Sequence, residues 1–249
     1  KMNILNIEHI SKIYGEKVIF DDVSLGIHSG DKIGVIGVNG TGKTTLLKII
    51  AKINEPDKGQ IICGNGIRVS YLPQNPEFPK KQSILEYVMD GKEHQDWKTE
   101  SEAKTILTKL GIYDFNEGCD HLSGGQKKRV ALARTLVDPT EVLILDEPTA
   151  VLTPQEADRL FDILRNMRDD GCAIIIITHK LQEVLALSDR VAILRKGQYI
   201  DTVETAKANV QSLSEMMVGA KVDLNIERPK PENVKKRLVI EGLNCKDKD

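Results

Sequence analysis

The octapeptide at residues 37–44 constrains the fold more than any other part of the chain; it reads GVNGTGKT. It fits the pattern GxxxxGK followed by Ser or Thr. It lies between residues 32–36, an apolar run typical of a buried strand, and residues 44–52, which have helical spacing. This order predicts a phosphate-binding loop, because consecutive N–H groups and the helix N-terminus can face an anion. The alternative, a glycine-rich turn with a surface lysine, requires all four fixed positions to match by coincidence.

Each position of this loop has a chemical role if a nucleotide binds there. Gly40 and Gly42 let the backbone turn so that its N–H groups face the β- and γ-phosphates. Lys43 supplies positive charge to the same phosphates, and the Thr44 hydroxyl can coordinate Mg²⁺. We therefore expect ATP and Mg²⁺ to bind. The other expected nucleotide contacts from this loop are Gly37, Asn39, Thr41 and Thr45.

A second apolar run, residues 142–145, ends in two adjacent acidic residues, Asp146 and Glu147. A carboxylate at the end of a buried strand is unfavourable unless a cation or a hydrogen-bond donor meets it. Strand ends that gather at one edge of an open parallel sheet are where ligands bind. We expect Asp146 to orient Mg²⁺, mostly through water, and Glu147 to polarise or deprotonate the attacking water. Taken alone, Asp146 could cap a helix and Glu147 could be a solvated loop acid.

The remaining pattern predicts an α/β fold. Short alternating runs before residue 36 predict a small antiparallel sheet, and a β region follows at 60–72. Three prolines then precede two amphipathic helices, at about 83–89 and 100–110. From residue 124 helices and strands alternate, with strands at 142–145, 173–178, 190–194 and 198–203 and helices at 154–168 and 181–187. The expected fold is a P-loop NTPase with a mostly parallel core sheet, an N-terminal antiparallel β subdomain and a helical insert at about 75–137.

Composition excludes several other classes of protein. A chain of 249 residues that is 40% hydrophobic can form one large domain, but no apolar run approaches the length of a membrane span. We therefore expect a cytoplasmic chain whose membrane role, if any, goes through a partner. The four cysteines form no CxxC pair and are expected to be reduced thiols. The net charge of −2 gives no reason to expect direct DNA binding.

The sequence LSGGQ at residues 122–126, followed by KKRVALAR at 127–134, resembles the signature of ABC-type ATPases. The other motifs of that family also occur in this chain, in the order in which the family has them. Tyr14 stands where the family stacks an aromatic ring on adenine, Gln74 in YLPQ matches the Q-loop, and His179 matches the switch histidine. The resemblance covers residues 3–220 and implies hydrolysis of ATP to ADP and phosphate.

This resemblance implies further roles. The signature residues Ser123, Gly124, Gly125 and Gln126 would bind the nucleotide of an opposite subunit, so that two cassettes enclose two ATP molecules head to tail. A second ABC cassette is therefore the expected partner, as a homodimer or a tandem half. His179 would act with Glu147 in catalysis, and Gln74 would join Thr44 and Asp146 as a metal ligand.

The resemblance divides along the chain. Residues 1 to about 137, with GDKIGVIG at 30–37 and YLPQNPEF at 71–78, resemble the first cassette of ABC-F proteins, which are ATPases associated with ribosomes. Residues from about 141 onward, with DEPTAVLTPQEADRL at 146–160, resemble the first cassette of tandem ATPases that drive simple-sugar and nucleoside importers. We hypothesise a hybrid chain, natural or engineered, joined near residues 136–141.

Departures from both patterns bear on the physiological role. The chain lacks the NHLD sequence, the inserted arm and the charged linker of ABC-F proteins. Thr153 replaces the usual D-loop aspartate, as in importers with DEPTA-x-LT, and a hydroxyl is a weaker partner than a carboxylate across a dimer interface.

Three functions stay open at this point. The chain could energise an importer through membrane permease subunits at the inner face of the cell membrane, act on the ribosome like an ABC-F protein, or bind ATP as an isolated module. The first of these functions is favoured, because this sequence lacks the inserted arm and the charged linker of ABC-F proteins. Residues 1–227 are the expected ATPase domain, and residues 228–249 are expected to contain a linker. LVIEGL at 238–243 repeats the pattern of LNIEHI at 5–10, which is either the start of a truncated second cassette or a chance match over six residues.

Overall fold

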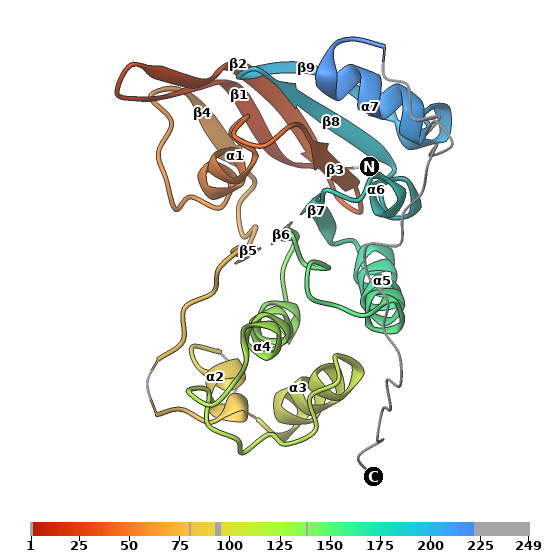
Figure 1. The fold of residues 1–249 in the computed structure, drawn as a ribbon. Helices are drawn as coiled ribbons and strands as arrows, with labels where there is room; N and C mark the ends of the chain where they lie inside the picture. The colour runs from red at the N-terminus through yellow and green to blue at the C-terminus, as the bar shows by residue number, and fades with distance from the viewer. Residues whose placement is uncertain (1, 80, 93–95, 138, 222–249) are drawn as a thin grey trace, which may run out of the picture.

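The computed structural model describes residues 2–79, 81–92, 96–137 and 139–221, and its elements follow the order predicted from the sequence (Figure 1). The strands are β1 (Asn3–Tyr14), β2 (Lys17–His28), β3 (Lys32–Ile36), β4 (Lys58–Cys63), β5 (Val69–Leu72), β6 (Val142–Asp146), β7 (Ala173–Ile177), β8 (Arg190–Arg195) and β9 (Gln198–Glu204). The helices are α1 (Lys43–Ile50), α2 (Ile84–Met89), α3 (Trp97–Lys109), α4 (Gly124–Val137), α5 (Pro154–Asp169), α6 (Leu181–Leu187) and α7 (Val210–Val218), with a short 3₁₀ turn at Thr205–Lys207.

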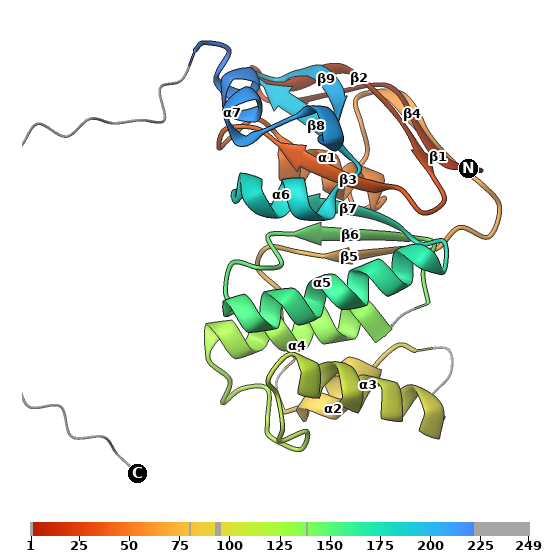
Figure 2. The same cartoon turned by 90° about the vertical axis from the view of Figure 1, so that its right-hand side faces the viewer.

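The inner strands of the core sheet are largely apolar and buried on both faces, as is typical of parallel sheets. The central order of the core sheet is β8-β3-β7-β6-β5, and every residue of β6 and β7 is buried. Alternate side chains of β6 and β7 enter two separate cores, while some side chains of β3 and β8 enter a third, smaller core beneath α6 and α7. Of the first two cores, one contains α2 to α5, and the other contains α1 and the N-terminal strands. Figure 2 shows the resulting layers, with α4 and α5 between the core strands and α2 and α3.

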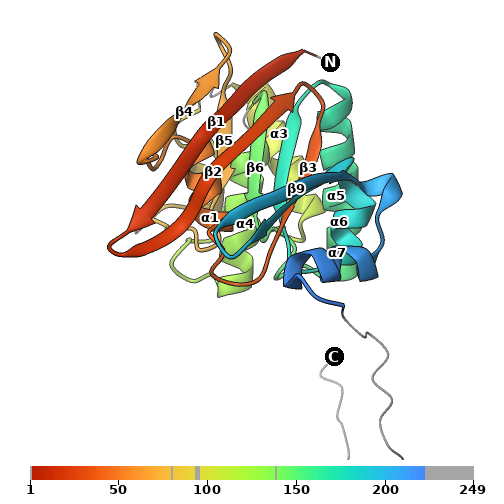
Figure 3. The same ribbon diagram turned by 90° about the horizontal axis from the view of Figure 1, so that it is seen from above.

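The N-terminal strands form the expected antiparallel subdomain. β1 pairs with β2 and with β4, and a single parallel bridge from Asp21 to Gln198 joins β2 to β9. From above, β1 and β2 run side by side, with β4 on the outer side of β1 (Figure 3). The β region predicted at 60–72 divides between two places: β4 joins this subdomain, whereas β5 is the edge of the parallel sheet beside β6.

Helix α7 was not predicted from the sequence. It packs on β8 and α6 through the buried Leu213, and its ends carry recognisable signals. Asn209 accepts a hydrogen bond from the Ser212 N–H at 2.8 Å, and Gly219 ends the helix in the left-handed region. In the same way, α3 begins at Trp97, earlier than predicted, because the Asp96 side chain caps it by accepting from the Thr99 N–H.

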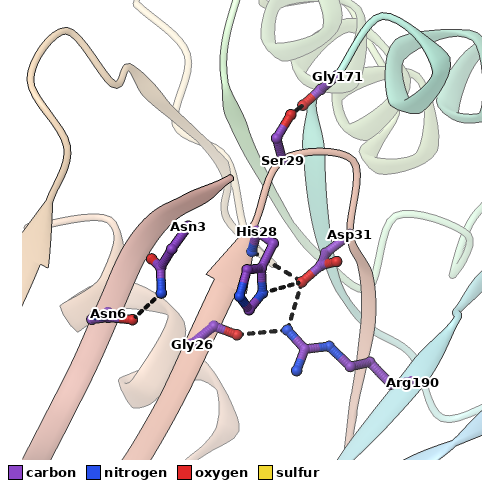
Figure 4. Close-up of polar contacts among 8 residues, drawn as sticks. All are labelled: Asn3, Asn6, Gly26, His28, Ser29, Asp31, Gly171 and Arg190. Atoms are coloured by element: carbon purple, nitrogen blue, oxygen red, sulfur yellow. Dashed lines mark hydrogen bonds and ion pairs between the residues drawn. The ribbon is translucent and has the colours of Figure 1, made fainter. Parts of the chain in front are cut away.

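A polar cluster fixes the edge of the sheet at which the parallel strands begin (Figure 4). Asp31, just before β3, accepts hydrogen bonds from the His28 N–H at 3.0 Å and from Arg190 Nη2 of β8 at 2.6 Å. Arg190 also donates to the Gly26 carbonyl, and the Ser29 hydroxyl donates to the Gly171 carbonyl before β7. These bonds tie the β2–β3 turn to two neighbouring strands and set the register in which the strands reach the opposite edge.

Other predictions can be compared with the described residues. Cys63, Cys119 and Cys172 are free thiols there, and no helix of those ranges is long and apolar enough to cross a membrane. The predicted linker and second-cassette start at 228–249 lie outside the described residues.

Candidate active site

The loop between β3 and α1 has its shape because two of its positions leave no room for a side chain. A Cβ on Gly37 would lie 2.3 Å from the Leu194 carbonyl oxygen of β8. Gly42 has φ +92°, and a Cβ there would lie 2.5 Å from a methyl group of Ile19 in β2. Gly40 also has positive φ, but its surroundings are open. The loop is therefore wedged between β2 and β8 with its tip facing solvent.

The side chain of Lys43 is buried and hydrogen-bonded to the backbone of this loop. Its Nζ donates to the carbonyl oxygens of Gly37 at 2.7 Å and Val38 at 3.1 Å, and only 7% of the residue is exposed. Burial lowers the pKa of Lys43, and the nearby carboxylates of Glu147 and Asp146 oppose that shift. The ammonium group is thus held by two carbonyls of the loop and lies near two acids, and its binding to phosphates stays a prediction.

The other loop residues divide by exposure. Val38, Asn39 and Gly40 are exposed, whereas Thr41 is buried and its hydroxyl donates to the Val38 carbonyl at 2.9 Å. Thr45 is half-buried on the first turn of α1. The exposed tip leaves backbone N–H groups accessible to a ligand.

The end of β6 meets the start of α1 through one hydrogen bond. The Thr44 hydroxyl donates to Asp146 Oδ2 at 2.8 Å, although the two residues are 102 positions apart in the chain. Asp146 is 1% exposed, and burial raises its pKa against the effect of Thr44, Lys128 and Lys43. A hydroxyl and a carboxylate oxygen side by side are ligands that suit Mg²⁺.

This donor set fits a cation held largely by its substrate. The described residues contain no group of three or more His, Cys, Asp or Glu side chains able to hold a metal alone. Mg²⁺ commonly takes one or two protein oxygens and completes its shell with water and substrate phosphates. Thr44 and Asp146 therefore fit Mg²⁺ that arrives with a nucleotide.

Glu147 and His179 lie at the ends of adjacent strands and contact one another. His179 Nε2 is 2.8 Å from Glu147 Oε1, the histidine being exposed and the acid buried. Burial raises the pKa of Glu147, and His179 opposes this shift. Glu147 has φ +56°, a strained conformation for a non-glycine residue, and its N–H donates to the Ile177 carbonyl at the end of β7.

The signature residues lie at the start of α4. Ser123 and Gln126 hold one another: the Ser123 N–H and hydroxyl both donate to Gln126 Oε1, and the Gln126 N–H donates to Ser123 Oγ. Ser123 and Gly124 are exposed, and Gly125 and Gln126 are half-buried. Their exposure agrees with a contact to a second chain, which stays a prediction.

Tyr14 and Gln74 are less closely tied to the loop. Tyr14 is exposed, its hydroxyl accepts from Asn54 Nδ2 at 3.2 Å, and Lys12 Nζ lies 5.5 Å from its ring centre. Gln74 is exposed two residues beyond β5, at the edge of the sheet that carries Asp146. Adenine stacking by Tyr14 and metal binding by Gln74 therefore stay predictions.

Two residues near the acidic pair were missed from the sequence. Lys128 of α4 is only 7% exposed, and its charge acts on both Asp146 and Glu147. Helical spacing signals its burial, because it shares a face with the buried Ala131 and Leu132. Tyr71 of β5 has a buried hydroxyl, and burial together with Asp146 raises its pKa.

Comparison with known proteins agrees with this geometry. A family model described as ABC transporter matches residues 20–150. The chain is 33% identical to the ribose import ATP-binding protein RbsA 2 of Burkholderia cenocepacia (92% of this chain, 49% of the relative) and 32% identical to the nucleoside import ATP-binding protein NupA of Lactococcus lactis (98% and 52%). It is 31% identical to the uncharacterized ABC transporter ATP-binding protein YfmR of Bacillus subtilis (95% and 42%). The chain spans about half the length of these relatives.

Solved structures confirm the predicted fold class. The ATP binding subunit of an ABC transporter superposes with a TM-score of 0.78 at 22% identity, covering 87% of this chain and 98% of that one. A dimeric ATP-binding cassette bound to ADP and phosphate gives a TM-score of 0.73 at 22% identity, covering 81% of this chain and 99% of that one.

The hypothesis of a hybrid chain can be compared with the sequence matches. Each of the three relatives named above covers more than nine-tenths of the chain, and so residues on both sides of 136–141. The hybrid origin is not tested by these matches and stays a hypothesis.

Proposed function

The chain belongs to the ABC transporter family, and from that premise we propose that it binds ATP with Mg²⁺ and hydrolyses it to ADP and phosphate. The observation that carries the proposal is the 2.8 Å hydrogen bond from Thr44 to Asp146. It joins the glycine-rich loop to a strand end that also bears Glu147, which contacts His179. A phosphate cradle, a cation site and a general base thus occupy one sheet edge.

The chain's own residues have separate tasks in this proposal. Lys43 exchanges its two carbonyl partners for the β- and γ-phosphates, and the exposed N–H groups of the loop surround the same oxygens. Thr44 and Asp146 hold Mg²⁺, which neutralises charge on the phosphates. Glu147 accepts a proton from water, whose oxygen bonds to the γ-phosphorus while the bridging P–O bond breaks. His179, in contact with Glu147, orients that carboxylate and the γ-phosphate.

The partners follow from the exposed signature. Ser123 and Gly124 are free to face the nucleotide of a second ABC cassette. The relatives named for ribose and nucleoside import support a role in energising an importer of that kind, through permease subunits at the inner face of the membrane. We do not propose a ribosomal partner, because none of the relatives reported above is named for one.

The test is a charge-removing substitution at the general base. Glu147→Gln should leave ATP affinity intact and lower turnover by roughly 10² to 10⁴, the usual range for loss of a general base. Glu141→Gln is the matched control, because Glu141 stands just before the opposite end of the same strand and should leave turnover unchanged. Wild-type turnover in Glu147→Gln would remove Glu147 from the mechanism.

A further inference from the structure

Glu183 on the first turn of α6 joins two loops that are far apart in the sequence. Its Oε2 accepts hydrogen bonds from the Thr149 hydroxyl at 2.6 Å and from the Thr178 hydroxyl at 3.0 Å. Its Oε1 lies 2.9 Å from Lys180 Nζ. A single carboxylate therefore binds a side chain of the turn after β6 and two side chains of the segment after β7.

The setting of this cluster makes these bonds strong. Thr149 and Thr178 are 2% and 3% exposed, and the Glu183 side chain is 13% exposed. Hydrogen bonds to an ionised acceptor are stronger than neutral ones, and a buried hydroxyl that loses its acceptor is left unsatisfied. The Lys180 N–H also donates to the Thr178 hydroxyl at 3.2 Å, so the segment that leads into α6 is fixed at both backbone and side chain.

The residues held by Glu183 are the neighbours of the two proposed catalytic groups. Thr178 and Lys180 flank His179, and Thr149 stands two residues after Glu147. Glu147 is strained, with φ +56°, and such a conformation persists only where the surroundings hold it. A backbone hydrogen bond closes the turn after Glu147, from the Ala150 N–H to the Glu147 carbonyl at 3.3 Å. The Thr149 hydroxyl links this turn to Glu183 of α6.

We propose that Glu183 is a positioning residue for the hydrolysis described above: by binding Thr149, Thr178 and Lys180 it fixes the distance between Glu147 and His179. This inference rests on the proposed function, since it assigns Glu183 to the same reaction. In this proposal Glu183 acts through the loops that it binds. A purely structural role, anchoring α6, would instead alter stability without altering the reaction of the folded protein.

Kinetics of the full chain separates these roles. Glu183→Ala should lower kcat by about 10²-fold, because a small misplacement of reacting groups has effects of that size. Its KM for ATP should change by less than about threefold, because the substrate contacts stay in place. Glu183→Gln keeps an acceptor for the two hydroxyls and loses only an ion pair to a largely exposed lysine, so kcat should stay within about fivefold of wild type. Equal losses in the two variants, or a wild-type kcat in Glu183→Ala, would overturn the proposal.

The matched control is a second buried carboxylate that ties a turn to neighbouring strands, at the other edge of the sheet. Asp31→Asn should lower the unfolding temperature and leave kcat per folded molecule unchanged. A Glu183→Ala loss of kcat that is matched by the same loss in Asp31→Asn would show that stability alone is involved.

Hydrogen exchange tests the contacts without any turnover. In Glu183→Ala the amides of residues 147–150 and 178–183 should exchange faster, while those of β1 and β2 keep their protection. Unchanged exchange in both segments would refute the positioning role. If the wild-type chain hydrolyses no ATP, the proposed function fails, but the exchange data still decide whether Glu183 holds the two loops.

Discussion

Two glycines of the phosphate loop should respond differently to the same substitution. Gly37→Ala places a Cβ 2.3 Å from the Leu194 carbonyl oxygen and 2.8 Å from Thr41 Oγ1. Gly40→Ala places one in open space, at a backbone φ of +79°. The first change is a steric conflict with a backbone atom of β8, and the second is only a conformational strain.

The magnitudes follow from these surroundings. Because real Cβ contacts essentially never fall below 3.0 Å, the loop or β8 must move by at least 0.7 Å (3.0 minus 2.3) in Gly37→Ala. Overpacking of this kind typically lowers the free energy of unfolding by about 1–3 kcal/mol. Gly40→Ala costs about 1–2 kcal/mol of left-handed strain. Reduced entropy of the unfolded chain offsets about 0.4–1 kcal/mol of either cost.

Thermal unfolding of the nucleotide-free chain measures both variants. For a chain of this size about 1 kcal/mol corresponds to a shift of about 2–4 °C, so Gly37→Ala should unfold up to about 10 °C below wild type. Gly40→Ala should unfold less than about 6 °C below it, by the same conversion. A larger destabilisation by Gly40→Ala than by Gly37→Ala would refute the reasoning, because the observed packing ranks them in the opposite order.

Three further outcomes are expected. Lys43→Ala should weaken ATP binding by about 100-fold or more in calorimetry, because it removes a charge-assisted contact to the phosphates; normal affinity would contradict the assignment. Burial raises the pKa of Cys172 to about 12, so at pH 8 Ellman's reagent should modify the half-buried Cys63 first and Cys172 only after denaturation. The hydrogen bond from Arg68 holds the pKa of Glu141 below its usual range. The contribution of this pair to the stability of the fold is therefore present above the unfolded-state pKa of Glu141 and is lost as pH falls through its folded-state pKa. After allowance for solvent screening, Glu141→Gln should lower the free energy of unfolding by about 0.5–1 kcal/mol at pH 7, and the difference should shrink as pH falls through the folded-state pKa of Glu141.

The sequence predicted the central constellation because its parts lie at the ends of recognisable strands. The loop after β3, the acids after β6 and the histidine after β7 meet because carboxyl ends of parallel strands share one edge. This rule predicted that Thr44 and Asp146 lie near one another at this edge, but the direct hydrogen bond between them was not predicted.

Other features depended on contacts that no local pattern carries. The β region at 60–72 looked continuous, but whether a strand joins the antiparallel subdomain or the parallel edge is decided by distant pairing partners. Glu183 resembles any acid in the first turn of a helix, and its role depends on Thr149, 34 positions away. Lys128 is the exception, because the buried Ala131 and Leu132 lie on the same face of its helix and signal its burial.

The central claim is that the chain hydrolyses ATP at a site completed by a second cassette. The most direct test is the rate of ATP hydrolysis against chain concentration, with Ser123→Arg measured in parallel. We predict that the rate of ATP hydrolysis by the wild-type chain rises more than linearly with chain concentration. We also predict that Ser123→Arg lowers this rate far more than it lowers ATP affinity. Turnover in strict proportion to concentration, or a Ser123→Arg variant that loses affinity but keeps turnover at saturating ATP, would contradict the account.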